Sequence, residues 1–508
     1  MSKFVTVPEM LAIEKAADQA GHSYAQMMVH AGHSIVEVLG ELFDGEFTAV
    51  ALVGKGNNGG DALVALTELQ MQGCACSAVL SEPREDELTA AFTKTGGTLK
   101  EWATLDEAAL TGLLAETDIF LDALLGTGIQ LPLRQKASQI LKATGIALAA
   151  CDPAPLVLAV DCPSGMDCQT GEIAPETIAA DLTVTMAAVK QGMLSFPAFV
   201  YVGELVVGDI GLPAGLKQWD SLQHYVMDQG LASTWLPQRA MNAHKGDFGK
   251  VLVIAGSREY PGAALISAKG AARSGAGLVS LASHSGLKAS FAGHIQEVTW
   301  TRMRKIVAQT EMAQNDDDAL SGFTSILLGP GLNKQVWKEL ALDKVISREG
   351  LPAMVFDAFA LRMFAKTENW WQLIPKHSVL TPHPGEFSEL TGLSTHEIQS
   401  NRLDLAAKYA AKWGQIVLLK GALTVIADPQ VRLTVVPVAN PALASAGSGD
   451  VLSGMIAALL AQGLKPFEAA SVAAWAHAEA ALLASDYFGS TRGILASDLI
   501  EFLPEVLQ

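Results

Sequence analysis

The chain has little positive charge for its length. Lysine and arginine number 35 against 53 aspartate and glutamate residues, and the formal net charge at pH 7 is -18. This excess of negative charge disfavours nucleic acid and anionic membrane surfaces as the main partners. An anionic ligand would therefore have to be held by local backbone amides, by individual lysines or by a bound cation.

Cysteines and long apolar runs are also scarce. The five cysteines all lie in the first third of the chain without metal-ligand spacing: Cys74, Cys76, Cys151, Cys162 and Cys168. This pattern is typical of reduced, cytosolic thiols. No uninterrupted apolar run is long enough to span a bilayer, and the first residues show no charged stretch followed by an apolar core. We therefore expect a cytoplasmic protein without membrane partners.

What the chain has in quantity is apolar residues, which make up half of its 508 positions. With about 150 residues per domain, this length predicts two to four domains, or two large α/β ones.

The most chemically specific stretch is 440–454. Small residues and glycines lead into an apolar run, residues 451–461, which predicts a helix beginning at Asp450. Gly447, Ser448 and Gly449 would then form an anion hole at the helix N-terminus. We expect the helix dipole and the loop amides to keep Asp450 ionised, so that it can take a proton from a hydroxyl that attacks a phosphoryl group. The alternative is that Asp450 only caps its helix.

In the first half, a predicted strand at 47–53 leads into a glycine loop, Gly54 to Asp61, and then a helix at 62–71. The loop formally matches the dinucleotide pattern G-x-G-x-x-G, but Asn57, Asn58 and Asp61 disagree with a pyrophosphate site, and the Lys-Ser or Lys-Thr of a P-loop is missing. Amides and a carboxylate fit a polar ligand or a cation better. A capped turn is the alternative.

Further predicted strands, with helical stretches between several of them, indicate a Rossmann-like doubly wound sheet; they span 75–80, 118–124, 156–161, 181–186 and 202–207. Asp122 and Asp161 each end a strand, at the edge where such sheets bind ligands. Asn58, Asp122 and Ser164 together offer hard oxygen ligands for a non-redox cation. Each alone would more often be a turn residue or a cap.

Three motifs in this half, Gly-Asn-Asn-Gly-Gly-Asp, Asp-Ala-Leu-Leu-Gly-Thr-Gly and Asp-Cys-Pro-Ser-Gly-Met-Asp, resemble those of NAD(P)H-hydrate epimerase domains over residues 1–215. The resemblance implies that Asn58, Asp122 and Ser164 bind potassium and that the domain interconverts R and S hydrates at C6 of the nicotinamide ring. The implied hydrate-binding residues are Asn57, Asn58, Gly59, Gly60, Asp61, Gly126, Thr127, Gly128, Ile129, Gln130, Leu131, Pro132 and Asp161. Asp161 and Lys190 are candidates for acid/base or polarising roles, although an exposed structural lysine is the commoner case. The sequence departs from the family pattern at Ala62 and Cys162, but both of these residues are small.

Proline, glycine and polar residues weaken the periodic pattern over 216–240, which we interpret as a linker. Residues 241–508 again alternate strand and helix, with predicted strands at 250–255, 277–282, 325–328, 353–357, 378–381 and 416–420. His383 follows one strand and is either a loop hydrogen-bonder or a ligand contact. Lys420 to Thr424 follow another strand and, with the anion hole, favour a nucleotide site.

This half resembles the ribokinase-like NAD(P)H-hydrate dehydratase domain through Thr-Pro-His-Pro-Gly-Glu, Leu-Lys-Gly-Ala-Leu-Thr and Ala-Gly-Ser-Gly-Asp-Val-Leu-Ser-Gly. The resemblance implies Asp450 as catalytic base, with Gly447 to Gly449 stabilising the transferring group. It implies ADP contacts by Lys420, Gly421, Ala422, Leu423, Thr424 and Gly449, and hydrate contacts by Ala264, Gly331, His383 and Asp450. The family usually has Asp-Ala-Asp-Ala-Leu where this chain has Asp357-Ala-Phe359-Ala-Leu361, so one carboxylate is replaced by an aromatic ring.

Together the halves resemble bacterial bifunctional NAD(P)H-hydrate repair enzymes. We expect the first half to epimerise NADH and NADPH hydrates and the second to dehydrate the S form with ADP, giving NAD(P)H, AMP and phosphate. Magnesium at the second site and assembly into a homo-oligomer are further expectations. The alternative is a ribokinase-like small-molecule kinase fused to a non-catalytic nucleotide-binding module.

Overall fold

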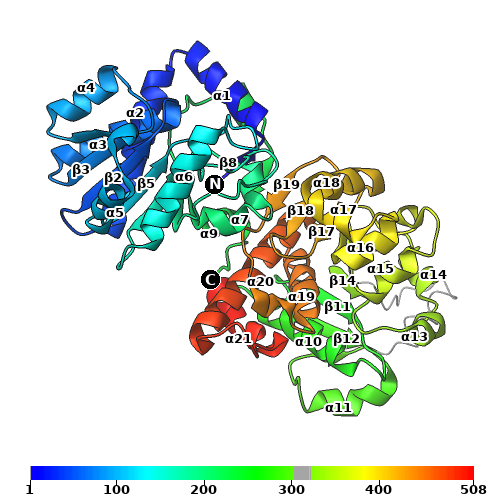
Figure 1. Cartoon of the computed structure of the whole chain (residues 1–508). Coiled ribbons are helices and arrows are strands. Elements are labelled where there is room, and N and C mark those ends of the chain that lie inside the picture. Colours follow the sequence, from blue (N-terminus) through cyan, green and yellow to red (C-terminus); the bar gives the residue numbers. More distant parts are fainter. Residues whose placement is uncertain (1, 302–319, 321) are drawn as a thin grey trace. The chain divides into compact units, whose positions relative to one another are not determined.

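The computed structural model describes residues 2–301, 320 and 322–508, which form two compact units, Ser2–Leu222 and Gln223–Gln508 (Figure 1). The main sheet has seven strands in the first unit and ten in the second. Helices alternate with strands in both, so the predicted two-unit α/β organisation is confirmed.

The first unit is built on a parallel sheet with the strand order β4-β3-β2-β5-β6-β7-β9. Its strands are β2 (Thr48–Val53), β3 (Ala75–Leu80), β4 (Thr98–Glu101), β5 (Ile119–Ala123), β6 (Leu156–Val160), β7 (Leu182–Met186) and β9 (Glu204–Gly208). The chain winds outward in one direction from β2 and in the other from β5, as predicted for a doubly wound sheet. The crevice for a ligand in such a sheet lies where this order reverses, between β2 and β5.

Strand β2 shows why helices cover both faces of this sheet. Ala49, Ala51 and Val53 pack into one apolar core together with α1, α2 and α3, while Val50 and Leu52 pack into another with α5 and α6. A strand with both faces buried needs a continuous apolar run, which β2 has. The helical segments are α1 (Val7–Gln19), α2 (Tyr24–Leu42), α3 (Asn57–Met71), α4 (Glu87–Lys94), η1 (Trp102–Thr104), α5 (Glu107–Ala115), α6 (Gln135–Ala149), η2 (Gln191–Leu194), α7 (Phe199–Val202) and α8 (Lys217–Asp220).

A second, two-stranded sheet joins the start of the unit to its ligand-binding edge. Strand β1 (Phe4–Val5) pairs in parallel with β8 (Val189–Lys190), with Val5 opposite Lys190. Thr6 then caps α1: its hydroxyl accepts a hydrogen bond from the backbone of Glu9, whose carboxylate in turn accepts one from the Thr6 amide at 2.8 Å. The start of α1 is therefore fixed relative to β8.

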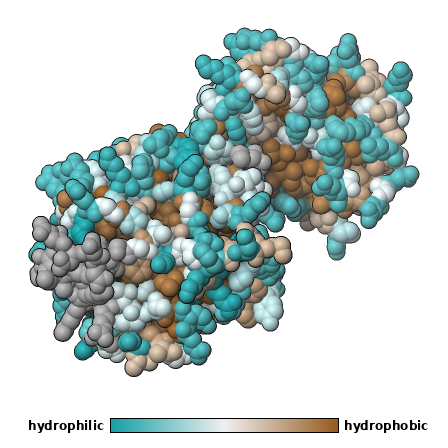
Figure 2. Space-filling view, turned by 180° about the vertical axis from the view of Figure 1, so that it is seen from behind, coloured by the Kyte–Doolittle hydropathy of each residue, from teal (hydrophilic) through white to brown (hydrophobic). Residues whose placement is uncertain are grey.

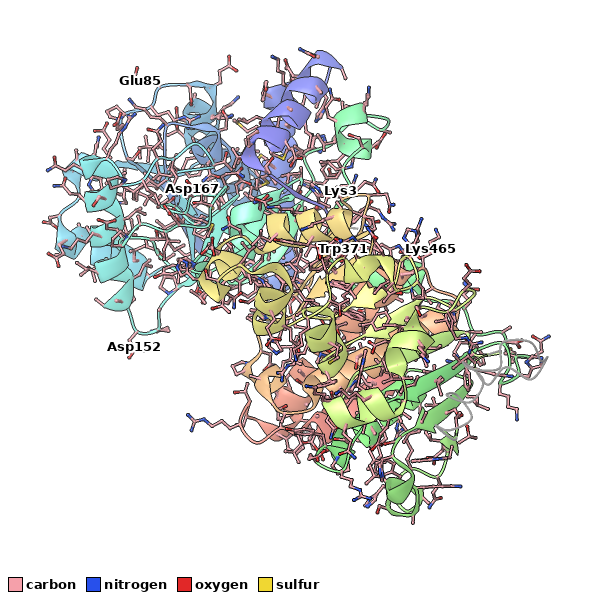
Figure 3. The ribbon with its side chains drawn as sticks, turned by 90° about the vertical axis from the view of Figure 1, so that its right-hand side faces the viewer. Lys3, Glu85, Asp152, Asp167, Trp371 and Lys465 are labelled. Carbon is pink, nitrogen blue, oxygen red and sulfur yellow. The ribbon has the colours of Figure 1, made fainter. Side chains whose placement is uncertain are left out.

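Figure 3 labels one loop residue at each end of the strands of this sheet. Glu85 lies in the loop after β3, on the side of the strand carboxyl ends, and Asp152 lies in the loop before β6, on the side of the amino ends. The polar motifs of the sequence follow β2, β5 and β6, so they belong to the carboxyl edge.

The boundary between the units differs from the linker predicted over 216–240. Residues 223–235 belong to the second unit, where β10 (His224–Val226) pairs in parallel with β19 and α9 (Gln229–Trp235) packs against α20. Leu231 of α9 is fully buried in that unit. The prolines and glycines that suggested a linker instead separate short elements that are completed by distant partners.

The described residues of the second unit form a mixed sheet with the strand order β10-β19-β18-β17-β16-β15-β14-β11-β12-β13, and among these strands β18 alone runs antiparallel to its neighbours. The other bounds are β11 (Lys250–Ile254), β12 (Leu278–Ala282), β13 (Thr299–Trp300), β14 (Ser325–Leu328), β15 (Met354–Phe356), β16 (Val379–Leu380), β17 (Ile416–Leu419), β18 (Val425–Ala427) and β19 (Leu433–Val435). The carboxyl ends of β15, β16 and β17 lead into the motifs that contain Asp357, His383 and Lys420.

One large apolar core lies between this sheet and the helices α10, α19, α20 and α21. Alanine and glycine let α10 and α19 approach closely: a side chain at Gly454 of α19 would meet the backbone of Ser267. The helices are α10 (Pro261–Arg273), η3 (Ser285–Leu287), α11 (Lys288–Ala292), α13 (Lys334–Glu339), α14 (Leu342–Ile346), α15 (Phe359–Phe364), η4 (Trp370–Gln372), α16 (Pro384–Thr391), α17 (Thr395–Ser400), α18 (Arg402–Trp413), η5 (Pro441–Ala444), α19 (Ser448–Ala461), α20 (Pro466–Phe488) and α21 (Ala496–Val506).

The apolar residues serve mainly to build these cores. Hydrophilic residues dominate the face shown in Figure 2, with smaller hydrophobic areas between them. Within the part of the chain that the structure describes, no helix has the length and apolar character needed to cross a bilayer.

Candidate functional site

A cavity of about 800 Å³ opens at the carboxyl edge of the first sheet, between the loops that follow β2 and β5. Most of the residues predicted to bind the hydrate line it: Asn57, Asn58, Asp61, Gly126, Thr127, Gly128, Ile129, Gln130, Pro132 and Asp161. Its volume is that of a pocket for a small-molecule ligand. Gly59, Gly60 and Leu131 are absent from the lining.

The segment from Asn57 to Asp61 is the start of a helix, not a loop. Helix α3 begins at Asn57, five residues before the predicted start. Gly59 faces the end of β2, where a Cβ would lie 2.2 Å from the carbonyl oxygen of Gly54, and Gly60 faces Met28. Small residues are thus needed here for packing, and the first turn of α3 directs its N-terminus toward the cavity.

Asn58, Asp122 and Ser164 are brought together around the backbone of Leu125. The Ser164 hydroxyl donates to Asp122 Oδ1 at 2.6 Å, and the Ser164 amide donates to Asp122 Oδ2 at 2.8 Å. Asn58 Nδ2 donates to the carbonyl oxygen of Leu125 at 2.8 Å, and the Leu125 amide donates to Ser164 Oγ at 2.9 Å. The start of α3, the end of β5 and the loop after β6 therefore place oxygen atoms around one small volume.

This cluster fits a cation. Oδ1 of Asn58 is buried and has no hydrogen-bond partner among the described residues. Asp122 is fully buried, and burial raises the pKa of its carboxyl against the opposing effect of the Ser164 hydrogen bonds. An orphaned amide oxygen beside a buried carboxylate is the hard-oxygen environment that a potassium ion would satisfy.

Asp161 and Lys190 form a buried ion pair at the end of β6. Lys190 is only 1% exposed, so it is not the exposed structural lysine considered as the alternative. Its ammonium also donates to Thr185 Oγ1 and to the carbonyl oxygen of Met186, each at 3.0 Å. Asp161 itself has a left-handed φ of 61° and accepts from the Met186 amide at 3.0 Å, so the pair is held rigidly beside the cavity.

Other acids gather near this pair. Asp61 is buried in the second turn of α3, and burial, with the charges of Asp161 and Glu14 adding to it, raises its pKa well above the usual range. Glu14, from α1, lines the same cavity. The site therefore holds three carboxyl groups around one buried ammonium.

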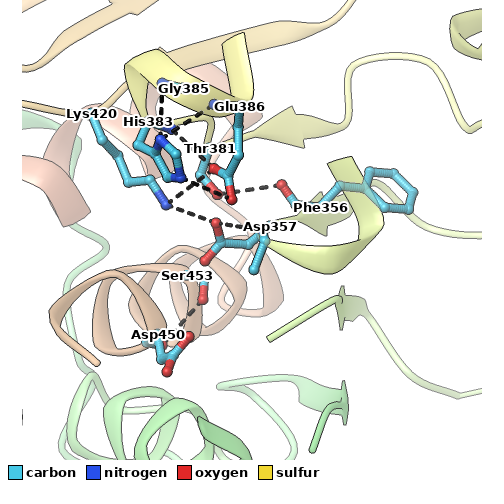
Figure 4. Close-up of polar contacts among 10 residues, drawn as sticks. Phe356, Asp357, Thr381, His383, Gly385, Glu386, Lys420, Asp450 and Ser453 are labelled. Atoms are coloured by element: carbon cyan, nitrogen blue, oxygen red, sulfur yellow. Dashed lines mark hydrogen bonds and ion pairs between the residues drawn. The ribbon is translucent and has the colours of Figure 1, made fainter. Parts of the chain in front are cut away.

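In the second unit, Lys420 is the centre of the polar site shown in Figure 4. Its ammonium donates to Asp357 Oδ1 at 2.8 Å and lies 4.0 Å from Glu386 Oε2. Burial alone would lower the pKa of Lys420, but the charges of Asp357 and Glu386 outweigh it and raise the pKa. A Cβ at Gly449 would lie 3.3 Å from the ammonium, so Lys420 reaches the first turn of α19. The structure thus places the predicted cation, Lys420, next to Gly449 of the predicted anion hole.

Asp450 lies in that first turn, but its charge state differs from the prediction. Helix α19 begins at Ser448, two residues before the predicted start, with Gly447 at a φ of 90° as its N-cap. Burial raises the pKa of Asp450 to about 7, and the nearby carboxylate of Asp357 adds to this. Desolvation therefore outweighs the helix dipole that was expected to keep the group fully ionised. A carboxyl that titrates near neutral pH suits a general base well.

His383 caps the helix that follows β16. Its Nδ1 accepts from the amides of Gly385 at 3.0 Å and Glu386 at 3.2 Å, and its Nε2 lies 3.4 Å from Glu386 Oε1. The imidazole is half exposed, so it can hold Glu386 toward Lys420 and still meet a ligand. This geometry is compatible with His383 as a hydrogen-bonding residue of the loop and with His383 as a ligand contact.

The remaining predicted positions differ in their accessibility. Ala264 is fully buried and packs near Gly256, and Leu423 is also buried, while Gly421 and Ala422 are exposed. Gly331 has a φ of 62° and lies against Tyr260 and Ala263. Phe359, in place of the usual aspartate, is half-buried and packs against Trp337 with ring centroids 6.1 Å apart.

Comparisons with known proteins match both halves of the chain. Residues 251–505 match the family model described as NAD(P)H-hydrate dehydratase, and residues 24–192 match the YjeF-related protein N-terminus. The bifunctional NAD(P)H-hydrate repair enzyme Nnr of Moorella thermoacetica is 35% identical, over 95% of this chain and 92% of its own length. The chain belongs to the family of bifunctional NAD(P)H-hydrate repair enzymes.

Two further relatives illustrate the extent of this similarity. The repair enzyme Nnr of Escherichia coli is 34% identical, over 97% of this chain and 91% of its own length. A solved ADP/ATP-dependent NAD(P)H-hydrate dehydratase from Bacillus subtilis, co-crystallised with ATP and Mg²⁺, is 33% identical with a TM-score of 0.49 and covers 56% of this chain and 97% of its own.

Three residues near the two repair-enzyme sites were missed by the sequence analysis. Glu14 is separated from the first site by more than 40 residues, although an acid on the buried stripe of an amphipathic helix was a usable signal. Arg402 donates to the carbonyl oxygen of Leu419 at 2.8 Å and so holds the end of β17. His477, on α20, hydrogen-bonds the backbone of Ser448, and burial lowers its pKa to about 4. No local sequence pattern identifies Arg402 or His477 as a residue near a site.

Proposed function

We propose that this chain repairs hydrated NADH and NADPH, with the first unit epimerising the R and S hydrates and the second dehydrating the S hydrate at the expense of ADP. The observation that carries the proposal is the full-length similarity to bifunctional repair enzymes, combined with a polar site in each unit. Joining the two activities is chemically sensible because a dehydratase specific for S would leave the R hydrate unrepaired.

In the second site, Asp450 is the general base. It takes the proton of the C6 hydroxyl as that oxygen attacks the β-phosphorus of ADP, and AMP leaves. The amides at the start of α19 and the ammonium of Lys420 stabilise the negative charge of the transferring group. The C6–O bond then breaks with release of phosphate, and loss of a proton from C5 restores the reduced ring.

The nucleotide is held by the loop after β17. The Lys420 amide donates to the carbonyl oxygen of Pro382 at 2.9 Å, which ties this loop to the one that carries His383. Gly421 and Ala422 are exposed there, so their backbone can approach a nucleotide. We assign Lys420 to Thr424 and Gly449 to ADP, and Gly331, His383 and Asp450 to the hydrate. Ala264 would contribute only through its backbone, because its side chain is buried.

In the first site, Asp161 at the end of β6 pairs with Lys190 of β8, beside the cavity that would take the hydrated nicotinamide. We assign potassium to Asn58, Asp122 and Ser164, where it would supply a fixed positive charge for an anionic ligand. The chain is further proposed to act in the cytoplasm and as a homo-oligomer.

Magnesium has no dedicated set of ligands among the described residues of the second site. Among the described residues, no three His, Cys, Asp or Glu side chains gather as a metal site, and Asp357 is already paired with Lys420. The proposed steps therefore use only the residues of the chain and the two substrates.

The proposal is tested by the recovery of reduced-nicotinamide absorbance from a mixture of R and S NADH hydrates, with ADP, with ATP and without nucleotide. We expect full recovery with ADP. Recovery of only the S fraction, beyond the spontaneous rate, would remove the epimerase from the proposal. No recovery at all would favour a small-molecule kinase, which the relatives that match both halves otherwise disfavour.

A further inference from the structure

Glu14 projects from α1 into the cavity of the first unit. The buried residues of this helix, Met10, Ile13 and Ala17, are spaced at three and four positions, and Glu14 falls on the same stripe. An acidic side chain is rarely placed on the core-facing side of a helix unless it is paired or used. Glu14 lines the cavity that Asp161 also lines, but it comes from a different wall.

The position of Glu14 is tied to the ion pair of the site by two independent connections. Strand β1, which leads directly into α1, is paired with the strand that carries Lys190, with Val5 opposite Lys190. At the start of α1, the amide of Val7 donates to Gln169 Oε1 at 3.0 Å, in the segment that follows Asp161. The helix is therefore anchored to the strand that carries Lys190 and to the segment that follows Asp161.

Burial favours the protonated form of Glu14, while the charges around it act in both directions. Burial raises its pKa, and the carboxylate of Asp161 adds to this, while Lys190 acts in the opposite direction. Asp61 on α3 is a further carboxyl group of the same cavity, and Tyr24 on α2 also interacts with Glu14. Lys190 is engaged with Asp161, so the cluster lacks the positive charge to hold all three carboxyls ionised.

We infer that Glu14 is a second acid/base residue of the first site, acting on the C6 hydroxyl while Asp161 acts on water at the opposite face of C6. This inference rests on the proposed epimerase activity. Epimerisation at C6 needs one C–O bond to break on one face of the ring and another to form on the other face, so two groups from two walls match the task.

The chemistry balances without any co-reactant other than water. The Glu14 carboxyl gives its proton to the C6 hydroxyl, the C6–O bond breaks and water leaves, while the N1 lone pair forms an iminium with C6. A second water adds to the opposite face of C6 and loses a proton to the Asp161 carboxylate. In the reverse direction the two residues exchange roles, and proton exchange with solvent resets them.

The test is the substitution Glu14→Gln in the full-length chain, measured as conversion of pure R hydrate to S hydrate after subtraction of the spontaneous rate. We expect kcat to fall roughly 10²-fold or more with KM within about threefold of the unmodified chain. The high-pH fall in kcat/KM that reports the acid should disappear. Glu14→Asp should recover at least about tenfold over Glu14→Gln. Asp18→Asn, which removes an exposed carboxylate from the same helix, is the matched control and should leave kcat unchanged.

Two outcomes would overturn the inference, and a third would overturn the proposed function. A kcat for Glu14→Gln within about threefold of the unmodified chain overturns the inference. A rise in KM without recovery by Glu14→Asp also overturns it, because Glu14 would then only shape the cavity. If the unmodified chain itself fails to epimerise the R hydrate, the proposed function fails, and the result is distinguishable from the other two.

Discussion

At the scale of single residues, burial decides the chemistry of Asp450 more than its place at a helix N-terminus does. The sequence showed the glycines, the helix and the acid, but not that Asp357, just after β15, and Glu386, on α16, approach it. Those neighbours are separated from Asp450 by more than 60 residues, so their effect on the pKa could not be predicted locally. The sequence also could not show that Oδ1 of Asn58 lacks a hydrogen-bond partner, because its surroundings come from residues distant in the chain.

The substitution Asp450→Asn should separate catalysis from stability. We expect dehydration of the S hydrate to fall roughly 10²- to 10⁴-fold, with epimerisation unchanged. In the unmodified chain the rate should rise with pH up to about 7 and level off above it, because the base must be ionised. A rate that does not depend on pH between 5.5 and 8 would contradict the assignment.

The same substitution should stabilise the second unit at high pH. The folded chain holds the Asp450 proton more tightly than the unfolded chain does, so the stability that this group contributes is lost as pH rises through about 7. At pH 8 we expect Asp450→Asn to raise the free energy of unfolding by about 1–3 kcal/mol, and at pH 5, roughly one pH unit above the pKa of an unfolded aspartate, by less than half as much. Denaturant unfolding at the two pH values measures this difference.

At the scale of elements, strong periodicity was sufficient for the long helices and buried strands, whereas short elements needed their partners. The apolar runs of β2 and α19 were both predicted. The three-residue strand β10 was not, because its pairing partner β19 lies about 200 residues away. The start of α3 was placed too late because Asn57 to Gly60 have the composition of a turn, and only the approach of Gly59 to β2 explains the glycines.

Two glycine substitutions test the packing of α3 on β2: one lies at this contact, and the other, on α5, is a control in open space. Gly59→Ala puts a methyl group 2.2 Å from the Gly54 carbonyl oxygen, so we expect the first unit to lose about 1–3 kcal/mol and epimerisation to weaken as α3 shifts. Gly112→Ala, in the open interior of α5, meets nothing within 4 Å and should stabilise by about 0.5–1 kcal/mol. Equal thermal midpoints for the two variants would contradict this account.

At the scale of the whole molecule, each unit has a complete core and its own polar site. The S hydrate made by the first site is therefore able to reach the second through solution. Mixing the Asp161→Asn and Asp450→Asn variants should restore full repair of the R hydrate with ADP, although neither variant alone repairs it. Failure of the mixture, with each single activity intact, would show that the hydrate must pass within one chain.

The pairing of β1 with β8 also has a consequence for biosynthesis. Residues 4 and 5 leave the ribosome well before their partners 189 and 190, which are made only after the rest of the first sheet except its last strand. At roughly 5–20 residues per second, the N-terminal strand waits about 10–40 s for its partner. The first site is thus completed late in translation, because Lys190 lies on the strand that pairs with β1.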